Sequence, residues 1–395
     1  MNRTGLLLCL GFLLPLYAQA APVLNVRTTC AAQGDGLTDD SAALAQCINL
    51  ALAAAAKGAR PIVYLPSGNY LVKGTKLPIM TYGIGLTGDG QHETYVTIDP
   101  SYSGTVFGWS EAWTKANFSG PTVTPANDFA GPMVHNLSVV GSTGSAAEQD
   151  AFVFYDRDDF VEFENVGVWF LNGQCLRTGE LLSQTQSYMR ESSFFNFICW
   201  SSGTASKPAV EISSVTTAIS DATNEVRFFK LDIFNAVGIG LQVHNPTAFG
   251  ATRLVDFFSP RVEQSGADNI QVSAQGDLGA TNSVRMYGVQ SLTPGVANNG
   301  FYALNLGLGA IQDYDIEIIG GTLGPCVAVT CNGLRIDNAR MVSVKLGNIA
   351  ASGVDVTYTA RTGGLVTLDG GGWESGWTYS VPGTVTVPLW NTFTP

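Results

Sequence analysis

Charged side chains are scarce in this chain of 395 residues. Asp, Glu, Lys and Arg together make up 13% of the residues, and 32 acidic against 20 basic side chains give a formal net charge of −12. An acidic protein has no electrostatic attraction for the phosphates of nucleic acid or for an anionic membrane surface. We therefore expect neither as a partner, and an acidic glycan would need a local basic groove or a bound cation.

Histidine is also rare, and the cysteines are not spaced as in zinc sites. The three histidines are His92, His135 and His244. Tetrahedral zinc sites draw their ligands from closely spaced cysteines and histidines, so structural zinc is not expected. Beyond residue 20, no apolar run approaches the roughly 20 residues that span a bilayer.

The first twenty residues have the pattern of a secretory signal peptide. Arg3 precedes an apolar run over residues 5–16, and Ala18-Gln19-Ala20 supplies the small residues of a cleavage site. An uncleaved anchor is the alternative. Cleavage predicts a secreted mature protein, extracellular or periplasmic, that consists of residues 21–395 and no longer contacts the membrane.

What the chain does have is typical of a sheet protein with many turns. It contains 45 glycines, and hydrophobic residues reach 45%. Six cysteines follow the signal segment, an even number that predicts disulfides in an exported protein and allows fifteen connectivities. Proximity in the sequence favours Cys30–Cys47, Cys175–Cys199 and Cys326–Cys331.

The segment from residue 25 to 98 carries the most specific pattern. A turn-rich stretch, GDGLTDDSAAL, starts at Gly34, and Thr38 or Asp39 could cap a helix that Gly58 ends. The apolar positions Leu44, Cys47, Ile48, Ala51 and Ala55 follow at helical spacing. Short strand patterns come next, in IVYLPSGNYLV and in LTGDG followed by VTI.

This ordered combination resembles the N-terminal segment of pectate-lyase-like β-helix proteins, over roughly 75 residues. The resemblance implies an all-β, single-stranded right-handed parallel β-helix, a solenoid whose open end is covered by an N-terminal capping α-helix. The aromatic-Gly-Ala stretch usual before the GDG is replaced by Thr28-Thr29-Cys30-Ala31. A Cys30–Cys47 bridge could hold the cap in its place.

The remainder of the chain reads as irregular coils of such a solenoid. We expect one domain with the cap and first rungs at 21–100, an inserted loop at 101–128, central rungs at 129–362 and a C-terminal cap at 363–395. Trp109 and Trp113 of the loop could stack on sugars or simply pack. Short alternating segments recur at 133–140, 160–170, 187–197, 225–233, 253–263, 283–291, 314–323 and 341–349. A β-sandwich or a propeller is the alternative.

The superfamily includes polygalacturonases, glycan lyases, glucanases and phage tailspikes. The Gly-His-Gly of polygalacturonases is missing here, and Arg335-Ile336-Asp337 has Asp where their Arg-Ile-Lys has Lys. A classical polygalacturonase is therefore not expected. The resemblance still implies a secreted enzyme, a glycan lyase or glycoside hydrolase, acting on an extracellular polysaccharide. The alternatives are a uronate epimerase and a non-catalytic carbohydrate-binding or cell-surface structural protein.

Aligning the rungs places a candidate catalytic cluster in the middle of the chain. Asp232 is expected near Arg261 on the next rung, with Asp256 and Glu263 on the same stretch as Arg261. Two carboxyl groups that face one groove are what glycoside hydrolysis requires. An ordinary surface ladder of opposite charges is the other interpretation.

A dense acidic turn is the candidate metal site. Asp156, Asp158 and Asp159 surround Arg157, and carboxylate oxygens are the ligands that Ca²⁺ prefers. A bound Ca²⁺ could neutralise a substrate carboxylate in a lyase. A solvated turn between rungs is the alternative. His244, expected just after a strand, is a candidate general base or a turn histidine without a role, and His135 is expected to be structural.

Overall fold

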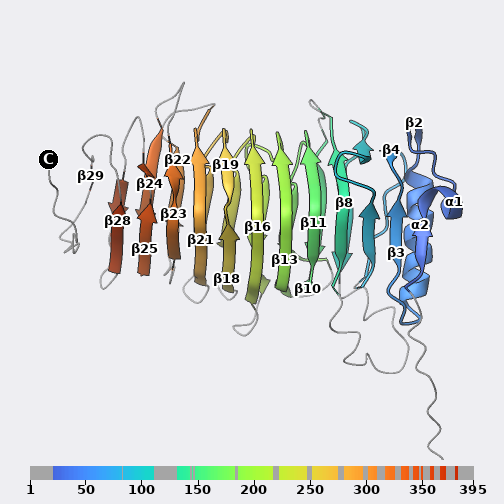
Figure 1. The fold of residues 1–395 in the computed structure, drawn as a ribbon, viewed down its shortest axis with the longest axis horizontal. Coiled ribbons are helices and arrows are strands. Elements are labelled where there is room, and N and C mark those ends of the chain that lie inside the picture. The colour runs from blue at the N-terminus through green and yellow to red at the C-terminus, as the bar shows by residue number, and fades with distance from the viewer. Residues whose placement is uncertain are drawn as a thin grey trace, which may run out of the picture.

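The computed structural model is a solenoid of parallel strands stacked along one axis (Figure 1). It describes residues 21–81, 83–110, 131–142, 145, 147–182, 186–216, 222–246, 251–274, 280–296, 301–308, 316–324, 331–337, 341–346, 348–349, 356–359, 365–370 and 379–380. The predicted all-β parallel β-helix is confirmed. The predicted signal segment lies outside the described residues.

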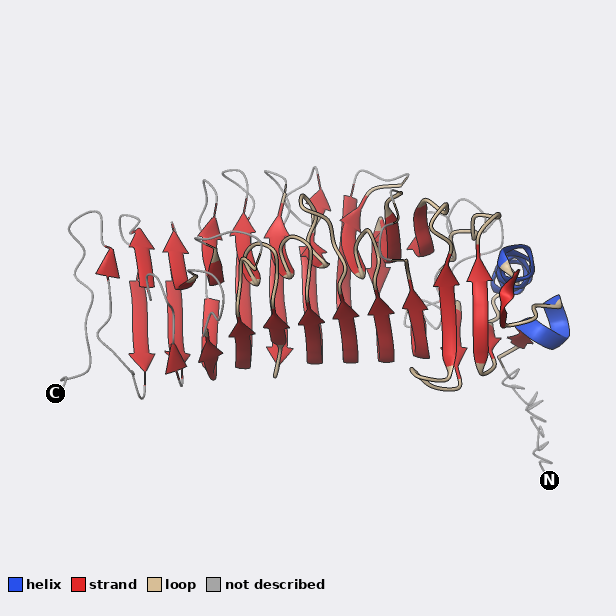
Figure 2. Ribbon diagram, turned by 90° about the horizontal axis from the view of Figure 1, so that it is seen from above, coloured by secondary structure: helices blue, strands red, loops and turns tan. Residues whose placement is uncertain are grey.

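The N-terminal end is closed by helix α2 (Ser41–Ala55), which lies across the first strands at one end of the stack (Figures 1 and 2). The face predicted to be apolar is buried. The helix begins after Asp40, so the predicted caps Thr38 and Asp39 are wrong and instead end a short strand. Asp39 still accepts a hydrogen bond from the backbone N–H of Ser41, at 3.0 Å. No helix in the described part of the chain is long and apolar enough to cross a membrane.

The rest of this end consists of short elements. They are β1 (Val23–Asn25), α1 (Val26–Cys30), β2 (Asp35–Asp39), β3 (Ile62–Leu65), β4 (Gly68–Val72), β5 (Gly85–Gly88) and β6 (Thr94–Ile98).

The longer of the two sheets, here called sheet A, has 19 strands and includes β1 to β6. Its other members are β8 (Met133–Val140), β10 (Arg157–Asp159), β11 (Glu162–Trp169), β13 (Gln186–Trp200), β15 (Val215–Thr216), β16 (Ala222–Phe234), β18 (Ala251–Phe258), β19 (Arg261–Glu263), β21 (Ala280–Leu292), β23 (Ile316–Leu323), β25 (Met341–Leu346), β26 (Asn348–Ile349) and β28 (Leu365–Gly370).

The second sheet, here called sheet B, has 10 strands that alternate along the chain with those of sheet A. They are β7 (Gly104–Ser110), β9 (Gln149–Tyr155), β12 (Leu176–Glu180), β14 (Val210–Ser213), β17 (Leu241–Asn245), β20 (Ile270–Ala274), β22 (Tyr302–Leu308), β24 (Asn332–Asp337), β27 (Val356–Thr359) and β29 (Tyr379–Ser380). From β7 onward, each described strand of sheet B is followed along the chain by one or two strands of sheet A, except β29 at the end. Figure 2 shows the strands stacked along the solenoid axis.

A column of left-handed residues bends sheet A along its middle. Asn136, Asn165 and Asn196 occupy matching positions on successive strands with φ of 57°, 53° and 52°. Asn tolerates this conformation better than most residues. The Asn165 amide donates to Asn136 at 3.2 Å, and the Asn196 amide donates to Asn165 at 3.1 Å. The column divides each rung of sheet A into two halves that face different directions.

Stacked aromatic rings fill the core. Phe194 lies 4.4 Å from Phe228, and Phe228 lies 5.1 Å from Phe257, measured between ring centroids with nearly parallel planes. All three side chains are at most 1% exposed. Each rung therefore buries its inward side chains against the neighbouring rungs, as a solenoid requires.

The inserted loop predicted at 101–128 is wrong over its first part. Residues 104–110 form strand β7 of sheet B, and Trp109 is fully buried against Phe154. Trp109 therefore packs in the core and does not overhang a groove, whereas Trp113 lies outside the described residues. Of the predicted C-terminal cap, β28 and β29 continue the two sheets, and Trp373, Trp377 and Trp390 are not among the described residues.

Two predicted disulfides are confirmed. Cys30 bonds to Cys47 and joins α1 to α2, and Cys175 bonds to Cys199 across the core. Cys331 is also disulfide-bonded, while Cys326 falls outside the described residues. Disulfides persist in oxidising compartments, in line with export.

Removing the first bridge is expected to loosen the cap. The double variant Cys30→Ala/Cys47→Ala should lose about 3 kcal/mol of unfolding free energy, because the bridge closes a loop of moderate length in the unfolded chain. Urea denaturation measures the loss. An unchanged midpoint would contradict the role of this bridge.

Candidate active site

The predicted mid-chain cluster is only partly brought together. Asp232 and Arg261 are direct register partners on neighbouring rungs, which confirms their predicted proximity. Arg261 donates to Glu263 at 2.7 Å and lies over the ring of Phe234. Burial raises the pKa of Asp232, and Glu263 adds to the rise.

Asp256 does not belong to this group. It lies on the other side of the bend at Ser259, and its buried carboxylate accepts two hydrogen bonds from Arg285, at 2.6 and 2.7 Å. A bidentate pair of this kind fixes both side chains. The catalytic role of Asp232, Asp256, Arg261 and Glu263 stays a prediction, with Asp256 paired to Arg285 and not to the other three.

The predicted acidic turn is not a solvated one. Asp156, Asp158 and Asp159 are at most 5% exposed. Asp156 accepts hydrogen bonds from the Ser110 hydroxyl at 2.9 Å and from the backbone N–H of Leu182 at 3.0 Å. Among the described residues, these three carboxyl groups are not a set whose ligand atoms converge for a metal ion. Calcium at this turn stays a prediction.

A denser polar network covers the outer face of sheet B, on strands β9, β12, β14 and β17. Side chains alternate in these strands, so Leu176, Val210 and Leu241 point into the core while their neighbours point outward. The outward residues Arg177 and Glu211 are register partners on adjacent rungs. Hydrogen bonds between Thr178 and Ser213, of 2.7 to 3.1 Å, lock this register.

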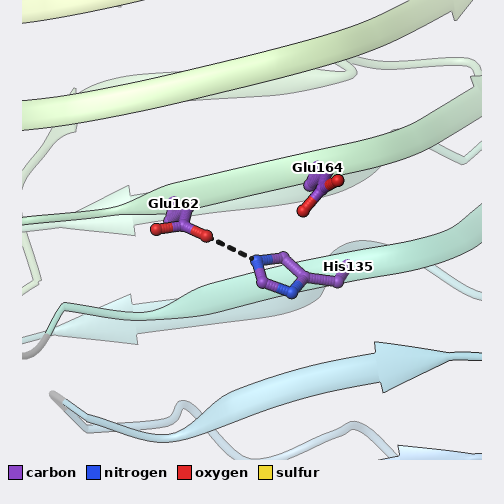
Figure 3. A group of neighbouring side chains, drawn as sticks. All are labelled: His135, Glu162 and Glu164. Atoms are coloured by element: carbon purple, nitrogen blue, oxygen red, sulfur yellow. Dashed lines mark ion pairs between the residues drawn. The ribbon is translucent and has the colours of Figure 1, made fainter.

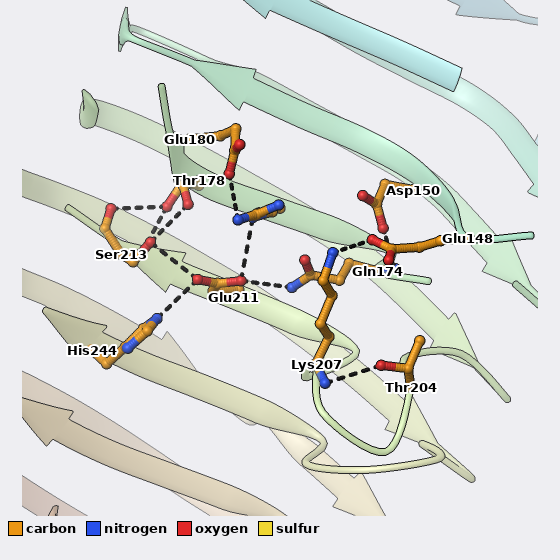
Figure 4. A network of polar contacts seen from close by, with 11 residues as sticks. Glu148, Asp150, Gln174, Thr178, Glu180, Thr204, Lys207, Glu211, Ser213 and His244 are labelled. Carbon is orange, nitrogen blue, oxygen red and sulfur yellow. Dashed lines mark hydrogen bonds and ion pairs between the residues drawn. The ribbon is translucent and has the colours of Figure 1, made fainter. Parts of the chain in front are cut away.

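Glu211 is the centre of the network (Figure 4). Its carboxylate lies 2.9 Å from Nε2 of His244, accepts from the Gln174 amide at 2.7 Å and lies 3.5 Å from Nε of Arg177. Burial alone would raise the pKa of Glu211, because only 12% of its side chain is exposed. The contacts from His244, Gln174 and Arg177 outweigh burial and hold the pKa below its usual value.

Glu180 also contacts the guanidinium of Arg177, with which its carboxyl group forms an ion pair. Its pKa shifts in the opposite direction. Burial raises the pKa of Glu180, and the nearby charge of Glu211 raises it further against the opposing charge of Arg177. The guanidinium of Arg177 therefore contacts two carboxyl groups, one with a raised pKa and one with a lowered pKa.

Further acids and a lysine extend the network along the same face. Asp150 is 7% exposed, accepts from the Gln174 backbone at 2.8 Å and has a pKa raised by burial. Glu148 forms an ion pair with Lys207. The face thus offers acids whose pKa values are shifted in opposite directions, beside cations, and such a composition is typical of sites for acid–base chemistry.

Of the residues that contact Glu211, only His244 was a candidate from the sequence. His244 lies within strand β17 and points outward, not after the strand as predicted. Arg177 and Glu211 were missed because sheet B strands are only four or five residues long here, too short for a clear alternating pattern. A sequence pattern that could have revealed the network is the charged or polar residue that each rung carries at a matching position.

A family model described as "Rhamnogalacturonase A/epimerase, pectate lyase-like" matches residues 23–193. Over this N-terminal part the chain is similar to pectate-lyase-like proteins, and its fold is a parallel β-helix. The resemblance read from the sequence is thereby confirmed. No curated protein sequence matches the chain.

Solved structures with this fold are similar to the chain at low sequence identity. The catalytic domain of Agl-KA is 14% identical with a TM-score of 0.50, and the alignment covers 92% of this chain and 69% of that one. The A-module of mannuronan C-5 epimerase AlgE4 from Azotobacter vinelandii is 16% identical with a TM-score of 0.44, covering 92% and 98%. ORF18 of Geobacillus virus E2 is 14% identical with a TM-score of 0.46, covering 92% of this chain. The chain spans 62% of that viral protein's length.

Proposed function

We propose that the protein is an exported enzyme that acts on a polysaccharide at the outer face of sheet B. The observation that carries the proposal is the Glu180–Arg177–Glu211 arrangement. Two carboxyl groups contact one guanidinium, and their pKa values are shifted in opposite directions. Such a divergence assigns an acid and a base in glycosidases. The matching family model supports a carbohydrate substrate.

Hydrolysis is the reaction that this pair supports best. Glu180 in its protonated form would donate its proton to the glycosidic oxygen as the bond to the anomeric carbon breaks. Glu211 as a carboxylate would either activate the water that adds to that carbon or attack the carbon itself, in which case water activated by Glu180 would then hydrolyse the glycosyl ester and free Glu211. Arg177 orients both side chains. The products are a new reducing end and a shortened chain.

A second candidate is proton abstraction from a uronate, as in a lyase or an epimerase. The contact between His244 and Glu211 favours it, because a carboxylate beside an imidazole orients a general base. Arg177 or Lys207 would then neutralise the sugar carboxylate. A non-catalytic binder is less well supported, since a face lined with converging acids and cations is costly to build for stacking alone.

A depolymerisation screen tests the proposal. Purified protein is incubated with neutral and acidic polysaccharides, with Ca²⁺ or with chelator, while reducing ends and the ultraviolet absorbance of unsaturated sugars are followed. Reducing ends without absorbance support hydrolysis, and absorbance supports a lyase. Loss of activity with chelator would support calcium at Asp156–Asp159. Neither signal from folded protein, together with no epimerised product, would move the function to binding.

Activity is expected to peak at weakly acidic pH. Glu180 is protonated only below its raised pKa, so activity should fall as the pH rises through that value. Glu211 is ionised above its lowered pKa, so activity should persist to a pH below the ordinary range of a glutamate. The profile of kcat/KM against pH measures both limbs. A rate that keeps rising above a pH of about 7 would contradict this assignment and favour His244 as the base.

A further inference from the structure

A second cluster of metal-binding side chains lies on sheet A, away from the network around Glu211. Strand β11 carries Glu162 and Glu164, which are two residues apart and therefore point to the same side. His135 on the neighbouring strand β8 is the register partner of Glu164. Figure 3 shows the imidazole and both carboxylates directed toward the space between the two strands.

The three side chains converge closely. One potential ligand atom from each of His135, Glu162 and Glu164 lies within 4.8 Å of the others. Nε2 of His135 lies 3.1 Å from a carboxylate oxygen of Glu162. That nitrogen is shielded from solvent, yet the contact lacks the direction of a hydrogen bond. A ring nitrogen without a hydrogen-bond partner is available to coordinate a metal ion.

The surroundings leave room for further ligands. Glu162 is half-exposed and forms part of the wall of a groove of about 450 Å³ over the first half of sheet A, together with Met133 and Ser193. This groove lies on a different sheet from the acid–base network. An ion at the cluster would have three protein ligands, of which Glu162 borders the groove, and its remaining positions could hold water, as in zinc sites that keep a water ligand.

The chemical types of the three ligands favour a divalent transition metal over Ca²⁺. One imidazole nitrogen with two carboxylate oxygens suits Zn²⁺ and similar divalent first-row metals. Ca²⁺ takes six to eight oxygen ligands and binds imidazole poorly. Structural zinc was not expected from the spacing of cysteines and histidines along the chain. These ligands are instead assembled from two rungs of the solenoid.

We propose that His135, Glu162 and Glu164 form a binding site for a divalent transition metal, with Zn²⁺ as the preferred ion. The ion clamps rung β8 to rung β11 and presents its open positions to the groove. The site is independent of the reaction on sheet B, so it can exist whether or not that reaction is correctly assigned.

Calorimetric titration of metal-free protein with Zn²⁺ tests the site. Wild-type protein is expected to bind one equivalent at this site with micromolar affinity. His135→Ala should weaken that binding at least about 100-fold, the upper end of what losing a supporting partner costs. His92→Ala removes a histidine outside the cluster and should leave the affinity unchanged.

Glu164→Gln separates a metal site from a simple ion pair. The ion pair of His135 is with Glu162, so an ion pair alone would not need Glu164. A loss of Zn²⁺ affinity in this variant, with an unchanged thermal midpoint in the absence of metal, supports the site. The proposal is overturned if Zn²⁺ does not bind at millimolar concentration, or if His135→Ala and Glu164→Gln bind it as tightly as wild-type protein.

Discussion

Glu211→Gln is expected to lower kcat by about 10³-fold, the scale of a lost acid–base group, while leaving the fold intact. Gln has nearly the same shape as Glu and can still contact the Gln174 amide and His244. It carries no charge, so it can neither accept a proton nor act as a nucleophile. Arg177 keeps its ion pair with Glu180. Initial rates on the best substrate of the screen, with circular dichroism for the fold, measure the effect.

Matched variants show whether the loss is specific to sheet B. Glu225→Gln makes the same substitution at a partly exposed glutamate of sheet A that pairs with Arg227. This variant should keep full activity. Glu263→Gln tests the cluster predicted from the sequence. If Glu263→Gln abolishes activity and Glu211→Gln does not, the active site lies near Asp232 and Arg261, and the assignment to sheet B is wrong.

Phe228→Ala is expected to reduce the free energy of unfolding by about 3–5 kcal/mol, the usual cost of removing a buried phenylalanine. The ring is fully buried and stacks on Phe194 and Phe257, so its loss leaves a cavity in a central rung. Because a solenoid is held together by contacts between neighbouring rungs, the two halves should also unfold less cooperatively. Chemical denaturation followed by fluorescence and circular dichroism measures both effects.

Phe229→Ala is the matched control, one residue further along the same strand. Its ring points outward and stacks on Phe195 and Phe258 at 4.8 and 4.9 Å. Solvent already reaches these rings, so the loss should be only about 1 kcal/mol, the scale of an aromatic pair. Equal losses for the two variants would show that the inner stack does not dominate the stability of the rungs.

The fold was largely predictable because its strands repeat an inward-facing apolar pattern. The segment predicted at 133–140 coincides with β8, and the apolar face of α2 was found from its spacing. Residues 104–110 were misread because the segment contains two glycines, and glycine is depleted in strands. In the structure Trp109 is one of the largest core side chains.

The candidate site was less predictable because it depends on register and on a bend. Asp232 and Arg261 could be aligned, but nothing in the sequence marked Ser259 as the left-handed residue that turns Asp256 away from them. On sheet B, His244 was predicted as a candidate general base without a partner. Its partner Glu211 lies on the previous rung, and only the stacking of coils brings the two together.

The most direct test of the account is a crystal structure of the Glu211→Gln variant with a substrate oligosaccharide. We predict that the sugar chain lies along the outer face of sheet B, with a glycosidic oxygen within hydrogen-bond distance of Glu180 and sugar hydroxyls near Arg177 and His244. An oligosaccharide bound over Asp232 and Arg261, or in the groove of sheet A, would contradict the assignment of the active site to sheet B.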